Sequence, residues 1–377
     1  MRKALKYLLA ILLAGIVAGY AAWTQYRPAG MFLSDLRSEI ALNQGTPGEH
    51  GNLLGIQPEL FPNDYRSPLL LRRKLAAYLE QARRDGLLND KTIVVFPEHI
   101  GTWLVASGEK NQVYTASSVS EAMAWLAASN PLQVLKALFA AKGQDRLADA
   151  LFRMKAEQMA HDYQTLFGGL ASEYGITLVA GSIVLPEPRV EDGRLLAGDG
   201  PLFNVSQVFG SDGQPIGQPQ RKVVPIIDEQ GFTAAAGAEQ LSVVNTPAGR
   251  LGVLVCADSW FPQNYQALAD GQVDLLAVPA FLTGNGSWDK PWGGYNGAAT
   301  PADVQIKAGE LSEGEAWQRL AMAGRIGQSG ARAGITVFMR GQLWDMGSDG
   351  HSLVANPAGH ALAPDDRGAR LINLWLE

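Results

Sequence analysis

The chain has 377 residues, of which 47% are hydrophobic and 18% are charged, as in a globular protein with a sizeable core. A formal net charge of −6, without any basic block, argues against nucleic acid as a partner, because phosphate binding needs clustered lysine and arginine. The single cysteine excludes an internal disulfide and a cysteine-rich zinc site.

The N-terminal segment, residues 1–27, differs from the rest of the chain. Its apolar run extends from Tyr7 to Trp23, and only Arg27 follows soon after. Three positively charged residues precede the run: Arg2, Lys3 and Lys6. The run is at the short end of the ~20 apolar residues that span a bilayer. The charge distribution places its start in the cytoplasm and the remainder of the chain outside, which would be the periplasm in a Gram-negative bacterium.

Two other interpretations of this segment stay open. Gly19-Tyr20-Ala21 loosely fits a small-x-small cleavage site, so a cleaved signal peptide and a secreted protein are the first alternative to a retained anchor. A buried core helix is the second. A lipoprotein anchor is excluded, because no cysteine follows the run.

Residues 28–50 are mixed in composition, contain several prolines and glycines, and are predicted to be a linker. Residues 51–377 are predicted to form one domain in which strands alternate with helices. Strands are expected at 52–60, 91–99, 175–185, 249–256, 273–281 and 334–340, with hairpins over 201–225 and 350–362. Helices are expected at 68–88, 118–129, 131–143, 144–174, 262–271 and 316–331.

Apolar strands that alternate with helices indicate an α/β fold with buried sheets. The stretch from about 105 to 150 is rich in alanine and leucine and is predicted to be a helical insertion.

Three residues with complementary chemistry follow predicted strands: Glu98, Lys222 and Cys256. A carboxylate can take the proton of a thiol, and an ammonium can stabilise a thiolate or an oxyanion. Taken singly, each residue has an ordinary explanation. A lone cysteine on a strand is more often inert core, a Pro-Glu pair is more often a surface turn, and a lysine beside an arginine is more often solvated.

The order and context of these residues resemble the nitrilase superfamily, also called the carbon–nitrogen hydrolases. The segment "VVFPEHIGTW" is similar to the family's strand that ends in Pro-Glu. The segment "QRKVVPIIDEQGF" resembles its Lys-x-x-Pro motif, with Glu229 seven residues after Lys222. The segment "GRLGVLVCADSWFP" resembles the block that holds the nucleophile. The resemblance covers roughly residues 52–365.

The resemblance implies a four-layer α-β-β-α sandwich that commonly forms homodimers. It also implies a hydrolase that cleaves the amide of a small molecule through a cysteine thioester. Glu98 would be the base, Lys222 the oxyanion stabiliser, Cys256 the nucleophile and Glu229 an orienting carboxylate. The Ala257 N–H would complete the oxyanion hole. Three aromatic residues are predicted to line the substrate pocket: Trp103, Phe281 and Trp288.

The sequence departs from the family pattern in two places. Ala257 stands where an aromatic residue is common in the family. The helical insertion lengthens the separation of Glu98 from Lys222 in the sequence. This insertion could be a lid, a membrane-facing cap or a dimer element. No cofactor or metal is implied, since the histidines have no ligand-like spacing. The alternative functions are a nitrilase, an N-acyltransferase that passes the acyl group to an amine, and an inactive scaffold.

Overall fold

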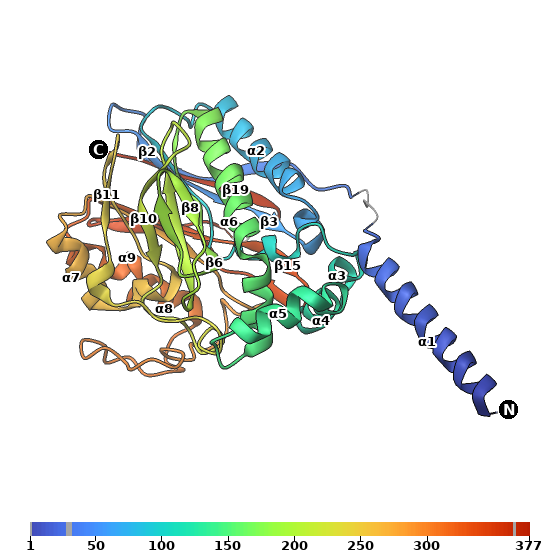
Figure 1. The fold of residues 1–377 in the computed structure, drawn as a ribbon. Helices are drawn as coiled ribbons and strands as arrows, with labels where there is room; N and C mark the ends of the chain where they lie inside the picture. The colour runs from blue at the N-terminus through green and yellow to red at the C-terminus, as the bar shows by residue number, and fades with distance from the viewer. Residues whose placement is uncertain (1, 28–31, 365–366) are drawn as a thin grey trace.

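The computed structural model describes residues 2–27, 32–364 and 367–377 (Figure 1). Residues 1, 28–31 and 365–366, which fall in the predicted N-terminal segment, linker and domain, lie outside the described residues.

Two large sheets form the centre of the domain. The first has the strand order β1-β19-β2-β4-β5-β9-β10, with β6 paired to β9. Its strands are β1 (Ser38–Gln44), β2 (Asn52–Gln57), β4 (Thr92–Val95), β5 (Thr177–Val179), β6 (Ile183–Pro186), β9 (Leu202–Phe209), β10 (Pro215–Arg221) and β19 (Ala369–Trp375). The second has the order β11-β12-β13-β14-β17-β18. Its strands are β11 (Val243–Thr246), β12 (Gly249–Val253), β13 (Leu275–Ala280), β14 (Ala333–Phe338), β17 (Leu353–Asn356) and β18 (Gly359–Leu362).

The two sheets pack face to face through aliphatic side chains. Leu53 and Ile93 of the first sheet share one buried cluster with Val253 and Ile335 of the second. The sheets approach closely at Gly55, where a Cβ atom would lie 2.8 Å from a methyl group of Val337. Burial on both faces explains why the central strands are continuous apolar runs.

Helices cover the outer face of each sheet. On the first sheet, α2 (Pro68–Arg84) and α6 (Arg146–Tyr174) contribute to its outer core. On the second, α7 (Pro262–Asp270) and α9 (Met322–Arg325) do the same. The domain is therefore the four-layer α-β-β-α sandwich that the sequence resemblance implied.

Smaller elements complete the domain. The helical insertion contains α3 (Asn111–Thr115), α4 (Val119–Ser129) and α5 (Pro131–Ala140), and α8 (Glu313–Leu320) precedes α9. Short 3₁₀ helices are η1 (Pro62–Tyr65), η2 (Thr102–Ala106), η3 (Ala238–Gln240), η4 (Cys256–Trp260) and η5 (Ile326–Gln328). The small sheets consist of β3 (Glu59–Leu60), β15 (Arg340–Leu343) and β16 (Met346–Ser348), and of β7 (Arg189–Glu191) and β8 (Arg194–Leu196).

The N-terminal segment is one helix, α1 (Arg2–Gln25), which projects away from the domain (Figure 1). Its part from Lys3 to Gln25 is long and apolar enough to cross a membrane, and a signal sequence would have the same composition. The apolar side chains of this helix are exposed, so the interpretation as a buried core helix is wrong.

Four sequence predictions need correction. The strand expected at 175–185 is divided into β5 and β6, with Gly181 in a left-handed conformation (φ 61°) between them. The predicted linker contains β1, which pairs in parallel with β19 and so forms part of the first sheet. The strand expected at 52–60 is divided into β2 and β3, with Pro58, which lacks an N–H, between them. The helix expected at 316–331 is interrupted at Ala321, whose backbone is extended (φ −99°, ψ −155°).

Candidate active site

The four predicted catalytic residues converge where strands from both sheets end. Glu98 follows β4, Lys222 follows β10, Glu229 lies in the loop after Lys222, and Cys256 follows β12. Each has at most 5% of its surface exposed. The structure therefore brings together all four of these side chains, which are as far as 158 residues apart in the sequence.

Lys222 lies between the two carboxylates. Its Nζ atom is 2.8 Å from Glu98 Oε1 and 2.5 Å from Glu229 Oε2. Burial alone would lower the pKa of Lys222, but the charges of Glu229 and Glu98 outweigh it and raise the pKa well above its ordinary value. Burial would raise the pKa of Glu229, yet Lys222 and His99 hold it below its ordinary value. The ammonium and the Glu229 carboxylate are therefore both charged at neutral pH.

Asn204, in β9, also holds both carboxylates. Its Nδ2 atom donates to Glu98 Oε1 at 2.9 Å and to Glu229 Oε1 at 2.8 Å, and the residue is fully buried. The backbone N–H of Ile226 donates to Glu229 Oε2 at 3.0 Å. Asn204 was not among the residues predicted to form the site, because an asparagine within an apolar strand shows its role only when its partners are known.

His99 lies beside this cluster, with its Nε2 atom 3.4 Å from Glu229 Oε1. Glu98, His99 and Glu229 are residue types that bind metal ions, and their ligand atoms lie within 4.8 Å of one another. The ammonium of Lys222 already occupies the position between the two carboxylates, and its charge would oppose a cation there. This arrangement fits a site that works without a metal.

Cys256 begins η4 with a left-handed backbone (φ 51°), which a residue other than glycine rarely adopts. Its S–H donates to the carbonyl of Phe281 at 3.7 Å. Burial raises the pKa of the Cys256 thiol well above its ordinary value, the charge of Glu98 raises it further, and Lys222 opposes the rise. The resting residue is therefore a thiol that must lose its proton as it reacts.

Asp258 connects the cysteine segment to the lysine segment. Its Oδ1 atom accepts from the N–H groups of Val223 and Val224 at 2.9 and 2.7 Å, and Oδ2 accepts from Val255 at 3.2 Å. Burial raises the pKa of Asp258 to about 7, although these three hydrogen bonds oppose the rise. This fully buried side chain fixes the position of Lys222 relative to Cys256.

A cavity of about 220 Å³ opens onto Cys256 and Ala257. Aromatic side chains form a large part of its lining: Trp260, Phe261, Phe281, Trp292, Tyr295 and Trp317. Trp260 stacks on Trp292 at 5.9 Å between ring centroids and meets Trp317 edge-on at 4.9 Å. Two acidic residues line the cavity, the exposed Asp228 and the half-buried Glu313, and burial raises the pKa of Glu313 to about 7.

The structure places two of the four predicted pocket residues on the cavity and the other two elsewhere. Ala257 and Phe281 line the cavity. Trp103 instead packs on Trp344 at 5.3 Å beneath the helical insertion. Trp288 stacks on His351 at 4.7 Å, outside the cavity lining. Position after a motif strand places a residue near the site, but it does not fix which way the side chain points.

Comparisons with known proteins identify a family and a fold similar to those of this chain. The model of the carbon–nitrogen hydrolase family matches residues 72–300, which is more than half of the chain. The chain is 31% identical to omega-amidase NIT2-B of Xenopus laevis over 143 residues, covering 36% of this chain and 48% of that protein. It is 43% identical to the deaminated glutathione amidase of Yersinia enterocolitica over 54 residues, covering 14% of this chain and 19% of that protein.

The matches to these two curated relatives therefore span about half of their length or less. Among solved structures, an amidase from Nesterenkonia sp. superposes with a TM-score of 0.51 at 16% identity, over 87% of this chain and 92% of that chain. At that identity the likeness establishes a shared fold and nothing finer.

Proposed function

The chain belongs to the carbon–nitrogen hydrolase family, and from this premise we propose that it hydrolyses the amide of a small molecule through a thioester on Cys256. The observation that carries the proposal is the buried cluster of Glu98, Lys222 and Glu229 beside a cysteine that opens onto a cavity. Relatives named as amidases support an amide as the substrate.

In the proposed first half-reaction, Glu98 takes the proton of Cys256 as the sulfur attacks the amide carbonyl. Lys222 and the N–H of Ala257 stabilise the oxyanion, and loss of one such donor typically costs about 10²–10³ in rate. Glu98 then gives the proton to the leaving nitrogen as the carbon–nitrogen bond breaks. The products are an amine or ammonia and a thioester on Cys256.

In the second half-reaction, Glu98 takes a proton from water, which attacks the thioester carbonyl. The carbon–sulfur bond breaks, Glu98 returns the proton to the sulfur, and the carboxylic acid leaves, which restores the thiol and the Glu98 carboxylate. Glu229 and Asn204 keep Lys222 and Glu98 in position throughout, since they contact these groups and not the cavity. No added redox or metal chemistry is needed for either half-reaction.

We also propose that α1 is retained as a membrane anchor and that the domain lies outside the cytoplasm. The apolar composition of α1 and the positive charges before it support this placement. A cleaved signal sequence is the alternative, and the mass of the mature protein in its native membrane distinguishes the two.

The test of the activity is ammonia or amine release by the purified full-length protein from a panel of amides, with nitriles as a second panel. Cys256→Ser and Glu98→Gln serve as matched variants. Release that both variants abolish supports the proposal. Release only when an added amine accepts the acyl group would favour the acyltransferase. A folded protein with an unreactive thiol and no turnover would favour the inactive scaffold.

A further inference from the structure

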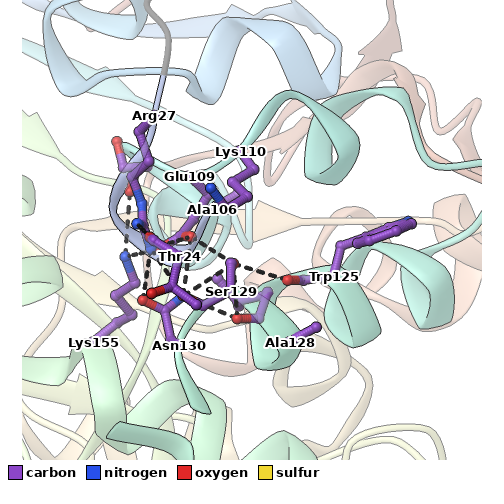
Figure 2. A network of polar contacts seen from close by, with 12 residues as sticks. Thr24, Arg27, Ala106, Glu109, Lys110, Trp125, Ala128, Ser129, Asn130 and Lys155 are labelled. Atoms are coloured by element: carbon purple, nitrogen blue, oxygen red, sulfur yellow. Dashed lines mark hydrogen bonds and ion pairs between the residues drawn. The ribbon is translucent and has the colours of Figure 1, made fainter. Parts of the chain in front are cut away.

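The C-terminal end of α1 is fixed to the helical insertion (Figure 2). Arg27, just beyond the helix, contacts Glu109 Oε2 at 3.2 Å and Asn130 Oδ1 at 2.8 Å. Lys110 donates to the carbonyl oxygens of Trp23 and Tyr26. These carbonyls belong to the last turn of α1 and its exit, where helices leave acceptors without internal partners.

Glu109 is the buried centre of this network. Its side chain is 1% exposed, and it also accepts from Ser129 Oγ at 3.2 Å and Asn130 Nδ2 at 3.0 Å, and pairs with Lys155 of α6 (Figure 2). A charge that is buried and fully partnered resists displacement, because removing any partner leaves it uncompensated. The end of α1 is therefore part of the folded domain, with a defined position relative to α4 and α5.

Aromatic residues cluster near the C-terminal end of α1. Tyr20 stacks on Trp23 at 5.8 Å, and Trp23 lies 6.4 Å from Trp125 of α4. The hydroxyl of Tyr20 donates to the carbonyl of Ala128, also in α4, at 2.5 Å. Tyrosine and tryptophan concentrate at the boundary between lipid tails and water. If α1 spans a bilayer, this aromatic cluster lies at the boundary between lipid and water, and α4 therefore lies at the bilayer surface.

The next helix, α5, exposes an apolar face. Leu132, Leu135 and Phe139 are 78%, 54% and 84% exposed. They recur at helical spacing, while Val134 and Ala137 are buried on the inner side. A helix that is apolar on both sides is unusual at a protein surface in water.

The charges around this face suit a phospholipid surface. Within residues 131–146, Lys136, Lys142 and Arg146 are exposed, and Asp145 is the one exposed acid, where it caps the start of α6. Two further exposed acids, Glu157 and Asp199, lie around the hollow beside α5. In Figure 1, α4 and α5 lie at the side of the domain toward which α1 extends. Lysine and arginine at the bilayer surface would meet lipid phosphates.

We propose that the outer face of α5 is a membrane-docking surface. It lies on the phospholipid bilayer that holds α1, with Leu132, Leu135 and Phe139 among the acyl chains. The proposal rests on α1 being a retained anchor. It gives the helical insertion the role of a membrane-facing cap, and it fixes the orientation of the catalytic domain above the bilayer.

The test uses full-length protein in vesicles of phosphatidylcholine and phosphatidylglycerol. In a Cys256→Ser background, an environment-sensitive fluorophore is attached to one of three single cysteines: Leu135→Cys on α5, Leu69→Cys on α2, or Leu12→Cys in α1. Leu135 and Leu69 are both 54% exposed, so they form a matched pair. Lipids that carry a nitroxide on the acyl chain quench a fluorophore only when it lies in the membrane.

We expect strong quenching at positions 12 and 135, several-fold greater than at position 69. Quenching at position 12 with equal, weak quenching at 135 and 69 would overturn the docking surface while leaving the anchor intact. A fluorophore at 135 that is shielded from an aqueous quencher, yet not quenched by the lipid nitroxide, would show that a second protein copy covers α5. No quenching at position 12 would overturn the anchor and, with it, the docking.

Discussion

Replacing Asn204 with leucine tests how the catalytic carboxylates are held. The two side chains have similar volume, so the change removes hydrogen bonds without opening a large cavity. Asn204 makes two hydrogen bonds to carboxylate oxygens, at 2.9 and 2.8 Å. Hydrogen bonds to charged groups contribute about 1.5–3 kcal/mol each, so their joint loss would cost about 3–6 kcal/mol.

The substitution also makes a stabilising contribution to the free energy of unfolding. Within the described part of the chain, Asn204 Oδ1 is buried without a hydrogen-bond partner, and leucine removes that unsatisfied oxygen, worth about 1–3 kcal/mol. We therefore expect the free energy of unfolding of Asn204→Leu to fall by about 2.5 kcal/mol, the difference between the midpoints of the two ranges. Looser carboxylates should lower kcat/KM by up to about 100-fold, because small misplacements of catalytic groups are costly.

The assays are denaturant unfolding in detergent and amide hydrolysis. The matched control is Asn245→Leu, which changes an exposed asparagine in β11 and should alter the free energy of unfolding by less than about 0.5 kcal/mol. A loss below about 1 kcal/mol for Asn204→Leu, together with unchanged kcat/KM, would refute the holding role.

Three further variants test the charges and walls of the site. Lys222→Met should lower the free energy of unfolding by about 3–5 kcal/mol at neutral pH, because it leaves two buried carboxylates unpaired. The free energy of unfolding of Lys222→Met should rise as the pH falls and the unpaired carboxylates take up protons. In the folded wild type the pKa of Glu229 is held low, so its free energy of unfolding should decrease as the pH falls below the pKa that Glu229 has in the unfolded chain. Parallel pH profiles for the two proteins would contradict this expectation. The pKa of Glu313 is raised to about 7, so its carboxyl becomes negatively charged as the pH rises through 7. KM for a cationic amide should then fall relative to KM for its neutral analogue, and Glu313→Gln should abolish this trend. A trend that persists in the variant would rule out Glu313 as its source. Trp260→Ala removes an aromatic wall that stacks on Trp292, so KM should rise with a smaller change in kcat; an unchanged KM would place substrate elsewhere.

The sandwich and the four converging residues could be predicted from the sequence through its resemblance to the carbon–nitrogen hydrolases, which rests on three motifs and their order. Glu98 and Cys256 follow apolar strand runs, whereas Lys222 follows the polar strand β10, "PIGQPQR", so strand pattern alone would not have identified it. The helical character of residues 105–150 was also predictable, because its alanine and leucine content favours helix. These features depend on local composition and on motif order, which a sequence displays directly.

Other features depend on contacts between distant segments. The strand β1 has the mixed sequence "SEIALNQ" and becomes a strand by pairing with β19, more than 300 residues later. Asn204 acquires its role only because Glu98 and Glu229 lie on either side of it. Trp260 and Trp292 form a cavity wall by stacking across a loop, which no periodicity in the sequence indicates.

Intact mass spectrometry of the full-length protein during turnover would reveal whether Cys256 forms a thioester. The protein is mixed with an amide that it hydrolyses and quenched in acid within the first turnovers. We expect an added mass equal to the acyl group on the wild type, absent from Cys256→Ala and strongly reduced in Glu98→Gln. Steady turnover without any adduct on the wild type, or an adduct that persists in Cys256→Ala, would contradict this expectation.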